Sequence, residues 1–497
     1  MKDLHGWFFF VMAEARKIFR NTLVLTLARL TESVSSILLV FLISRKLGVT
    51  GLGVYSATLA YYGLIALAAE FGTTNFLVRE IAKDRSVTSR YLVHLGGIGA
   101  LAGVFATTVA VPLIPLLGYS AELTTCVYII LLAIVPGTLN TMQEAVFVAH
   151  QRVELQTYTT FLAALLSFSL SLYLLMQDYG VVSLVVTFVL IRYVITVCYL
   201  FLTHIYIAPL RWEFHLSFAR TLVSEIKAFA ASSLLAGLFM RPEIILLSLF
   251  ATELQTGYYS AALKLVDLWY LLPATYMVNV FPVLSRSYHV TDDKAQEIQE
   301  RSVKYLLALS FPVAVGLTVA ATPIVQLFYG PEFAPAITIL QILAWNVPLY
   351  CLNSVLWRVL VARGQQDLNV RVQSITAVTR LTAGGMLIAA FGALGAAITA
   401  VANLFLHNRL LAFYLKRDGV RLPTWRLTWR FALAASIMGV MVLACREHVH
   451  LGVLVPLAAT LYVVLIVVCR AISAEELAFF RRLISLSVRE KQASQPV

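Results

Sequence analysis

Long apolar stretches alternate with short polar segments along the whole sequence. Fourteen of these stretches approach or exceed the roughly 20 residues that an α-helix needs to cross a hydrocarbon core of about 30 Å. The expected spans are 21–43, 54–76, 91–117, 123–148, 157–176, 181–207, 228–250, 256–284, 305–328, 337–361, 371–391, 393–415, 429–445 and 451–469. The pattern therefore predicts an all-α polytopic membrane protein with about 14 transmembrane helices.

The composition agrees with this prediction. The chain of 497 residues is 60% hydrophobic and 13% charged, whereas soluble domains are nearer half apolar and a quarter charged. The first apolar run is broken by Glu14, Arg16 and Lys17 and lacks a small-residue cleavage site, so we expect an interfacial helix rather than a cleaved signal. The five cysteines lie in apolar stretches without CxxC spacing, and we expect neither a metal nor a cofactor.

Basic residues are distributed unevenly between the two sides of the predicted spans. Alternate polar segments, beginning with the N-terminal one, hold 28 Lys and Arg residues, while the other side holds Arg45, Lys46 and Arg446. Because Lys and Arg accumulate on the cytoplasmic side, we expect a multi-pass protein of the cytoplasmic (inner) membrane with both termini in the cytoplasm. Most of the net charge of +12 is then a topological signal at the lipid bilayer, and no nucleic-acid partner is expected.

The first junction between spans is repeated in the second half of the chain. A shift of 204 residues lays Gly53, Tyr55, Ser56, Ala57 and Leu59 on Gly257, Tyr259, Ser260, Ala261 and Leu263. A shift of 212 residues lays Gly180 on Gly392. Because six spans are an even number, two six-helix lobes keep the same orientation and form a parallel pseudo-two-fold repeat. Such repeats are typical of transporters in which the substrate passes between the lobes.

The repeat divides the chain into five segments. We expect an N-lobe at 1–207, with an interfacial N-terminal segment and six spans, and a C-lobe at 228–415 with six more. Between them, a cytoplasmic linker at 208–227 mixes apolar and charged positions as an amphipathic surface helix does. The last two spans lie at 416–470, and a cytoplasmic tail at 471–497.

Four segments resemble the oligosaccharide flippases of the multidrug/oligosaccharidyl-lipid/polysaccharide exporter superfamily. They are "AEFGTTNFLVREIAKD" at 69–84, "LFYGPEFAPAITILQILAWNVP" at 327–348, "ARGQQDLNVRVQSI" at 362–375 and "FGALGAAITAVAN" at 391–403. The resemblance implies a V-shaped transporter, not an enzyme, that moves polyprenyl-pyrophosphate-linked oligosaccharides from the cytoplasmic to the outer leaflet. Such flippases feed the assembly of O-antigen lipopolysaccharide, capsule or exopolysaccharide. A polysaccharide polymerase and chain-length machinery would then be partners of a flippase that acts as a monomer.

Charged side chains fall within several predicted spans, where an ionised group costs a few kcal/mol or more unless it faces water or a partner. The candidates for substrate binding are Arg29, Arg192, Arg241, Lys264 and Arg380, and those for ion coupling or charge pairing are Glu32, Glu70, Glu243 and Asp267. Arg29 with Glu32, and Lys264 with Asp267, are i,i+3 pairs whose members could neutralise each other.

Spacing favours the three other arginines as functional groups. Arg192, Arg241 and Arg380 have no carboxylate at i±3 or i±4 on their own helices. A pyrophosphate is a dense anion, and arginine offers paired donors to its oxygens. The resemblance also implies positive residues that line a central cavity, which favours Arg29, Arg241 and Lys264. No catalytic residue is expected.

Other functions remain open from the sequence. A multidrug or cation antiporter on the same fold would use buried carboxylates, and Glu32, Glu70 and Asp267 keep that alternative open. A flippase for peptidoglycan precursors would differ only in its substrate. A membrane polysaccharide polymerase or ligase is less well supported, because the chain has no HExxH, GxSxG or Walker motif and no long outward loop.

Overall fold

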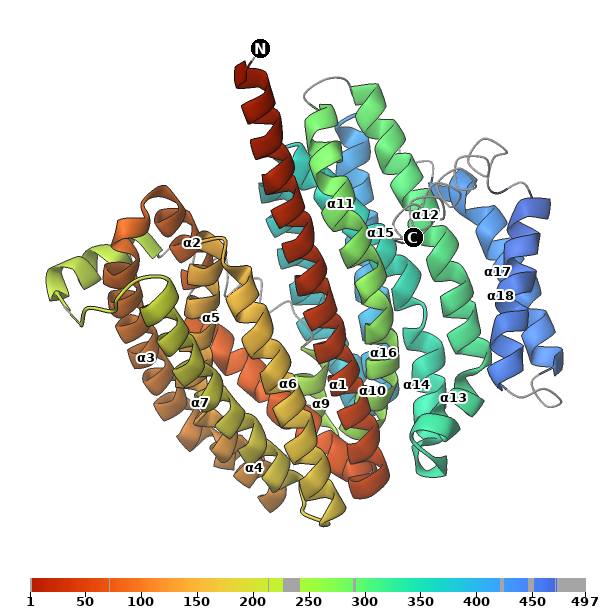
Figure 1. Ribbon diagram of the computed structural model, residues 1–497. Coiled ribbons are helices and arrows are strands. Elements are labelled where there is room, and N and C mark those ends of the chain that lie inside the picture. Colours follow the sequence, from red (N-terminus) through yellow and green to blue (C-terminus); the bar gives the residue numbers. More distant parts are fainter. Residues whose placement is uncertain are drawn as a thin grey trace, which may run out of the picture. The chain divides into compact units, whose positions relative to one another are not determined.

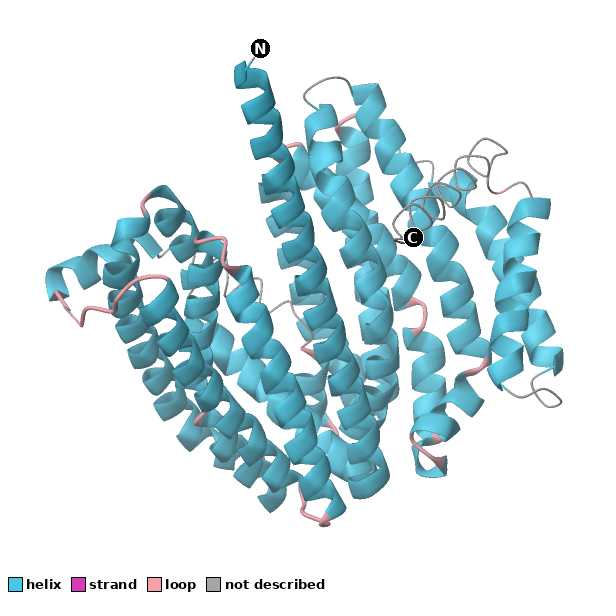
Figure 2. Ribbon diagram, viewed as in Figure 1, coloured by secondary structure: helices cyan, strands magenta, loops and turns pink. Residues whose placement is uncertain are grey.

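The computed structural model describes residues 2–70, 72–212, 214–226, 242–288, 292–420, 424–445, 451–469 and 471, with side chains except at 2–33, 292, 424–427 and 451. Helices account for most of these ranges, which contain no strand (Figure 2). The predicted all-α fold is therefore confirmed.

Long helices joined by short turns build the first half of the chain (Figure 1). They are α1 Lys2–Glu70, α2 Thr73–Lys83, α3 Thr88–Leu113, α4 Ala121–Leu131, α5 Ile134–Ala149, α6 Val153–Met176 and α7 Val181–Tyr206. The short 3₁₀ segments η1 Arg85–Val87 and η2 Ile114–Leu117 flank α3. The linker contains a further helix over residues 216–226.

The second half of the chain is also built from helices joined by short turns. Its helices are α9 Glu243–Phe250, α10 Glu253–Asp267, α11 Leu271–Tyr288, α12 Asp292–Val319, α13 Ala321–Phe328, α14 Pro335–Leu343, α15 Asn346–Ala362, α16 Gln366–Arg417, α17 Thr424–Cys445 and α18 Leu451–Val468. The 3₁₀ segments η3 Leu268–Tyr270 and η4 Pro331–Phe333 interrupt them.

The helices account for the predicted spans. Nine helices in the described ranges are long and apolar enough to cross a membrane, and α4 with α5, bent by 45°, makes a tenth. Both α1 and α16 contain two predicted spans, separated by the non-helical residues Gly48 (φ 67°) and Gly392 (φ 55°). The shorter apolar stretch Gly452–Val468 adds another span. The remaining prediction, 228–250, lies partly outside the described residues, and α9 is its described end.

The chain folds into two compact units, each with its own apolar core. The first comprises Met1–Lys264, Phe328–Ala336 and Gln373–Thr399, and the second comprises Leu265–Leu327, Ile337–Val372 and Ala400–Val497. In the first unit, α2, α3 and α5 bury Phe76, Leu95 and Met142 in one cluster. In the second, α12 packs against both α15 and α17.

A polar contact recurs at equivalent positions of the two lobes. In the N-lobe, the Thr196 hydroxyl on α7 donates to Asn140 Oδ1 on α5 at 2.8 Å. In the C-lobe, Asn353 Nδ2 on α15 donates to Asn408 Oδ1 on α16 at 3.0 Å. Asn353 and Asn408 follow Asn140 and Thr196 by almost the same shift that aligns the two lobes. The repeat in the sequence is therefore also a repeat of helix packing, and the predicted two-lobe organisation is confirmed.

The turn after α5 carries a histidine whose protonation opposes folding. His150 Nε2 lies 2.8 Å from the Thr88 hydroxyl at the start of α3. Burial, with a smaller contribution from Arg85, lowers the pKa of His150. The folded protein therefore binds fewer protons at this site than the unfolded chain, in which the histidine pKa is about 6.5. The contribution of neutral His150 to the free energy of unfolding is complete above a pH of about 6.5 and is lost as the pH falls towards the lower pKa of the folded state.

We therefore expect the thermal unfolding midpoint to fall as the pH is lowered below about 6.5. His150→Gln, which keeps a polar side chain but cannot titrate, should flatten this dependence. Unfolding of the full chain in lipid nanodiscs, followed at neutral and mildly acidic pH, measures the effect. An identical pH dependence in the wild type and in His150→Gln would contradict the expectation.

Candidate functional site

The two duplicated junctions lie against each other at one side of the first unit. A methyl group on Gly53 would collide with the carbonyl oxygen of Glu253, and one on Gly257 would collide with that of Val49. Val49 and Glu253 are related by the same 204-residue shift as Gly53 and Gly257, so the contact is reciprocal. Backbones approach this closely only where no Cβ intervenes. We call this contact the glycine junction.

Hydrogen bonds on the same side of the first unit join turns that are distant in sequence. The backbone N–H of Ala393 donates to Gln255 Oε1 at 2.9 Å. Arg45 Nε donates to the carbonyl oxygen of Phe328 at 3.1 Å. Both bonds lie at helix ends that adjoin the glycine junction. We call this side of the first unit the junction side.

Four charged candidates lie at similar depths in helices of the first unit. At a rise of 1.5 Å per residue, Arg192 and Lys264 are each about 16 Å from the junction-side ends of α7 and α10. Arg380 is about 18 Å from the break at Gly392, and Glu243 about 10 Å from the end of α9. Half of a hydrocarbon core of roughly 30 Å is about 15 Å. These groups therefore lie towards the middle of the membrane-spanning helices.

Arg380 and Glu243 form a buried ion pair. Arg380 Nε donates to Glu243 Oε1 at 2.5 Å, which joins α16 to α9. The Glu243 side chain is 1% exposed and that of Arg380 is 18% exposed. Arg380, a candidate for substrate binding, and Glu243, a candidate for ion coupling or charge pairing, are therefore direct partners.

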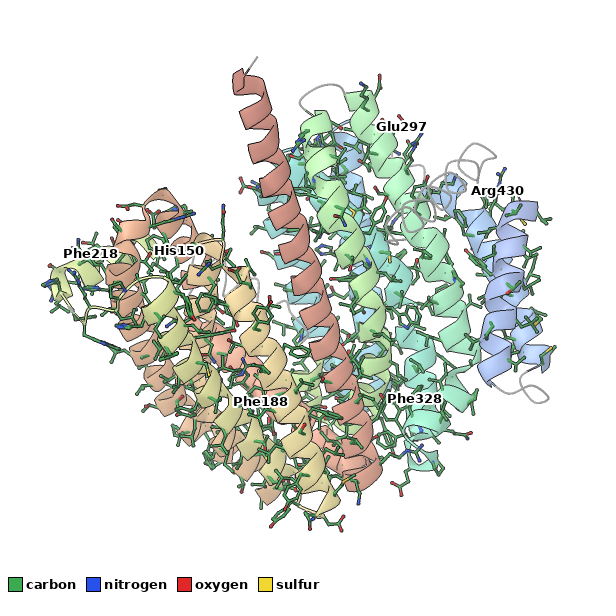
Figure 3. All side chains as sticks on the ribbon, viewed as in Figure 1. His150, Phe188, Phe218, Glu297, Phe328 and Arg430 are labelled. Carbon is green, nitrogen blue, oxygen red and sulfur yellow. The ribbon has the colours of Figure 1, made fainter. Side chains whose placement is uncertain are left out.

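Arg192 is held by aromatic rings. Its guanidinium lies 4.9 Å from the ring centroid of Phe188, which Figure 3 labels on α7, and 5.6 Å from that of Tyr62 on α1. None of the ion pairs among the described residues involves Arg192. Nearby, the Tyr199 hydroxyl donates to the Glu144 carboxylate at 3.3 Å. A cation on ring faces keeps its charge while the rings replace part of its hydration.

The remaining candidates among the described residues contact other side chains than those around Arg192 and Arg380. Lys264 Nζ donates to the Ser36 hydroxyl on α1 at 2.7 Å, and Asp267 follows one turn later on α10. The Glu70 carboxylate accepts from the Thr74 hydroxyl, where α1 gives way to α2. The side chains of Arg29 and Glu32, and the whole of Arg241, lie outside the described residues.

A group of hydroxyls near the junction side was not predicted. The Tyr61 hydroxyl on α1 contacts that of Tyr119 and lies 2.9 Å from Ser248 Oγ on α9. No spacing or motif connects these three residues, because they come from three separate segments. The cluster therefore becomes visible only once the helices are packed.

The second unit contains an apolar cavity of about 740 Å³. It is lined by η3, α11, α12, α13, α17 and α18, with Trp269, Leu309, Val313, Met438 and Val455 among its lining residues. Nearly all of its wall is hydrocarbon, so it is suited to an apolar chain rather than to a sugar or phosphate.

Solved structures show which class of protein has this fold. The structure matches the lipid II flippase MurJ in an inward closed conformation with a TM-score of 0.77 and 14% identity, over 93% of this chain and 100% of that one. It matches an inward-facing multidrug resistance MATE family transporter of the MOP superfamily with a TM-score of 0.66 and 15% identity, over 79% and 98% of the two chains. The chain is thus a multi-pass membrane protein with the fold of that superfamily.

The family itself follows from the sequence. The family described as polysaccharide biosynthesis protein matches residues 43–338, which is more than half of the chain. This chain therefore belongs to that family, and the predicted resemblance is confirmed. A second family, described as lipid II flippase MurJ, matches residues 245–467.

Two curated relatives from Haloferax volcanii are similar to parts of the chain. A probable low-salt glycan biosynthesis flippase is 26% identical over 198 residues, which are 40% of this chain and 42% of the relative. A probable flippase is 26% identical over 226 residues, 44% and 47% of the two chains. The matches thus span less than half the length of these relatives. Both relatives are described as flippases rather than as enzymes.

Proposed function

We propose that the protein is a flippase that moves polyprenyl-pyrophosphate-linked oligosaccharides from the cytoplasmic to the outer leaflet of the cytoplasmic membrane. Family membership and relatives described as flippases support this class of activity. Both termini and the linker face the cytoplasm in this proposal, and the junction side faces outward. The product serves cell-surface polysaccharide assembly of the O-antigen type, with a polymerase and chain-length machinery as partners of a monomeric flippase.

The placement of Arg192 is the observation that carries the proposal. Arg192 is a cation near the middle of the membrane, seated on two aromatic rings and outside every ion pair of the described residues. A polyprenyl pyrophosphate must move a dense anion through this depth, where water no longer screens its charge. A guanidinium can donate two hydrogen bonds to adjacent phosphate oxygens. Lys264, Arg380, Arg29 and Arg241 are the further candidates for this cationic path.

The transport cycle is alternating access. In the structure the glycine junction is closed, so in this proposal the headgroup enters from the cytoplasmic side and leaves when the junction side separates. The lipid chain remains in apolar surroundings throughout, and the cavity of the second unit, with its hydrocarbon lining, can hold part of such a chain.

Arg192→Gln should lower the rate of flipping by about 10- to 150-fold, because a hydrogen bond to a charged group contributes roughly 1.5–3 kcal/mol. Arg192→Lys keeps the charge but loses the planar fork, so an intermediate rate is expected. The assay uses full-length protein in vesicles with fluorescent lipid-linked oligosaccharide, and scores access of the headgroup to an external reagent.

The control for this assay is Arg301→Gln. Arg301 forms an exposed i,i+4 ion pair with Glu297 on α12, so its loss should leave the rate unchanged. Equal rates in the wild type and in Arg192→Gln would remove Arg192 from the path. Absence of flipping for every polyprenyl-linked glycan tested would overturn the proposed function itself.

A lipid II type substrate is the second candidate. It is favoured by the match of residues 245–467 to the lipid II flippase family and by the shared fold. Both substrates carry a polyprenyl pyrophosphate, so the same assay with a lipid II analogue decides between them. Cation antiport is less well supported, because the charged candidates comprise five basic and four acidic residues, and one of the acidic residues, Glu243, is already neutralised by Arg380.

A further inference from the structure

The linker helix over 216–226 has three distinct faces. The face towards the protein consists of Ala219, Leu222 and Ile226, which are buried. A polar exposed face consists of Ser217, Thr221, Ser224 and Glu225. The third face, spaced i,i+4,i+7, consists of Leu216, Arg220 and Val223, and it is exposed although two of its three members are apolar. A water-facing helix needs only two faces, so the third face requires an explanation.

The linker packs on the side of α3 that faces lipid. A Cβ on Gly97 would lie 3.3 Å from Phe214 Cε2. Gly97 shares one helix face with Leu101 and Val104, which are 68% and 53% exposed. In a membrane-spanning helix, such an exposed apolar stripe contacts hydrocarbon. The linker therefore continues the lipid-facing surface of α3.

Specific contacts hold the linker in this position. The backbone N–H of His215 donates to His94 Nε2 at 2.8 Å, and the His94 and Phe214 rings stack at 4.9 Å. The Arg90 guanidinium lies 4.0 Å from the ring centroid of Phe218, which Figure 3 labels. The exposed third face is therefore presented in a fixed orientation.

We propose that this linker binds the bilayer interface and selects anionic phospholipid headgroups. We call Arg211, Trp212, Leu216, Arg220 and Val223 the linker face. Trp212 is 78% exposed, and tryptophan prefers the headgroup level of a bilayer. Arginine can lay its apolar stem along the membrane while its charge reaches the headgroups. Two exposed arginines and three exposed apolar side chains within this one linker fit an anionic lipid surface better than water or a neutral protein surface.

The proposal is independent of the transported substrate, so it is tested by lipid contact. Full-length protein is reconstituted in vesicles that contain brominated phosphatidylcholine or brominated phosphatidylglycerol, which quench nearby tryptophan. The difference between the wild type and Trp212→Phe isolates the Trp212 emission. We expect this emission to be quenched, and to be quenched more strongly by phosphatidylglycerol, with about a fivefold preference for each arginine.

Arg211→Gln with Arg220→Gln should abolish the preference for phosphatidylglycerol and leave quenching by phosphatidylcholine. Lys83→Gln is the matched control, because Lys83 is exposed but already donates to Glu80 at 2.9 Å. Trp212 emission that is unquenched by either lipid and accessible to aqueous iodide would overturn the proposal. Shielding from both lipid and iodide would do so as well, since a protein surface would then cover the linker face. Equal quenching by the two lipids in the wild type would refute selection by the arginines.

Discussion

Replacing Gly257 with alanine is expected to separate the glycine junction and to shift the protein towards a state that is open on the junction side. The new methyl group would collide with the carbonyl oxygen of Val49 and lie 2.9 Å from Val49 Cγ1. A backbone carbonyl in a packed helix cannot swing aside as a side-chain tip can. Overpacking of this kind costs about 1–3 kcal/mol, which lowers the closed population relative to the open one by about 5- to 150-fold.

A cross-link beside the junction measures this shift. The Ser120 hydroxyl donates to the carboxylate of Glu253, whose carbonyl oxygen faces Gly53, so Ser120→Cys with Glu253→Cys, in a background without the native cysteines, should be joined by a short bifunctional thiol reagent when the junction is closed. Gly257→Ala should lower the yield. Gly63→Ala is the control, because Gly63 lies on α1 with no atom within 4 Å of the added methyl group. An unchanged yield in Gly257→Ala would show that the junction does not separate.

The transmembrane architecture could be predicted from the sequence because the bilayer imposes it. Each span needs a fixed apolar length, and each added or missing span would have disturbed the alternation of basic residues. The breaks at Gly48 and Gly392 fall in the gaps between predicted spans, and both residues have positive φ. The bend between α4 and α5, at Leu132 and Ala133, was also to be expected, because it lies one turn before Pro136, whose ring clashes with the carbonyl group four residues earlier.

The partners within the candidate site could be predicted only in part. Spacing along one helix shows i,i+3 and i,i+4 pairs, and Arg380 has none, which suggested a cavity-facing charge. Its partner Glu243 is 137 residues away and is brought close by the packing of α9 against α16. The reciprocal contact of Gly53 and Gly257 was not predicted either, although their equivalence was. A repeat shows which residues correspond, but it does not show which residues touch.

Removing one member of the Arg380–Glu243 pair is expected to destabilise the protein by about 3–5 kcal/mol, because the other charge is left buried without its partner. This applies to Arg380→Met and to Glu243→Leu alike. The double variant replaces both charges by apolar groups and should recover much of that loss. Thermal unfolding of the four proteins in nanodiscs gives the coupling free energy. The matched control is the Lys46–Asp178 pair, in which Lys46 Nζ lies 3.2 Å from Asp178 Oδ1 and the side chains are 45% and 83% exposed. Its coupling free energy should be about 0–1 kcal/mol.

The double variant also separates stability from transport. If the pair only joins α9 to α16, the refolded double variant should flip lipid-linked oligosaccharide at the wild-type rate. If Arg380 exchanges Glu243 for the substrate pyrophosphate during the cycle, the double variant should be stable and should flip at least about tenfold more slowly, since a charge-assisted hydrogen bond is lost. We expect the second result, because Arg380 is 18% exposed while Glu243 is fully enclosed. An anion that reaches this depth therefore meets the arginine before the carboxylate, and Glu243 holds the guanidinium in place until then.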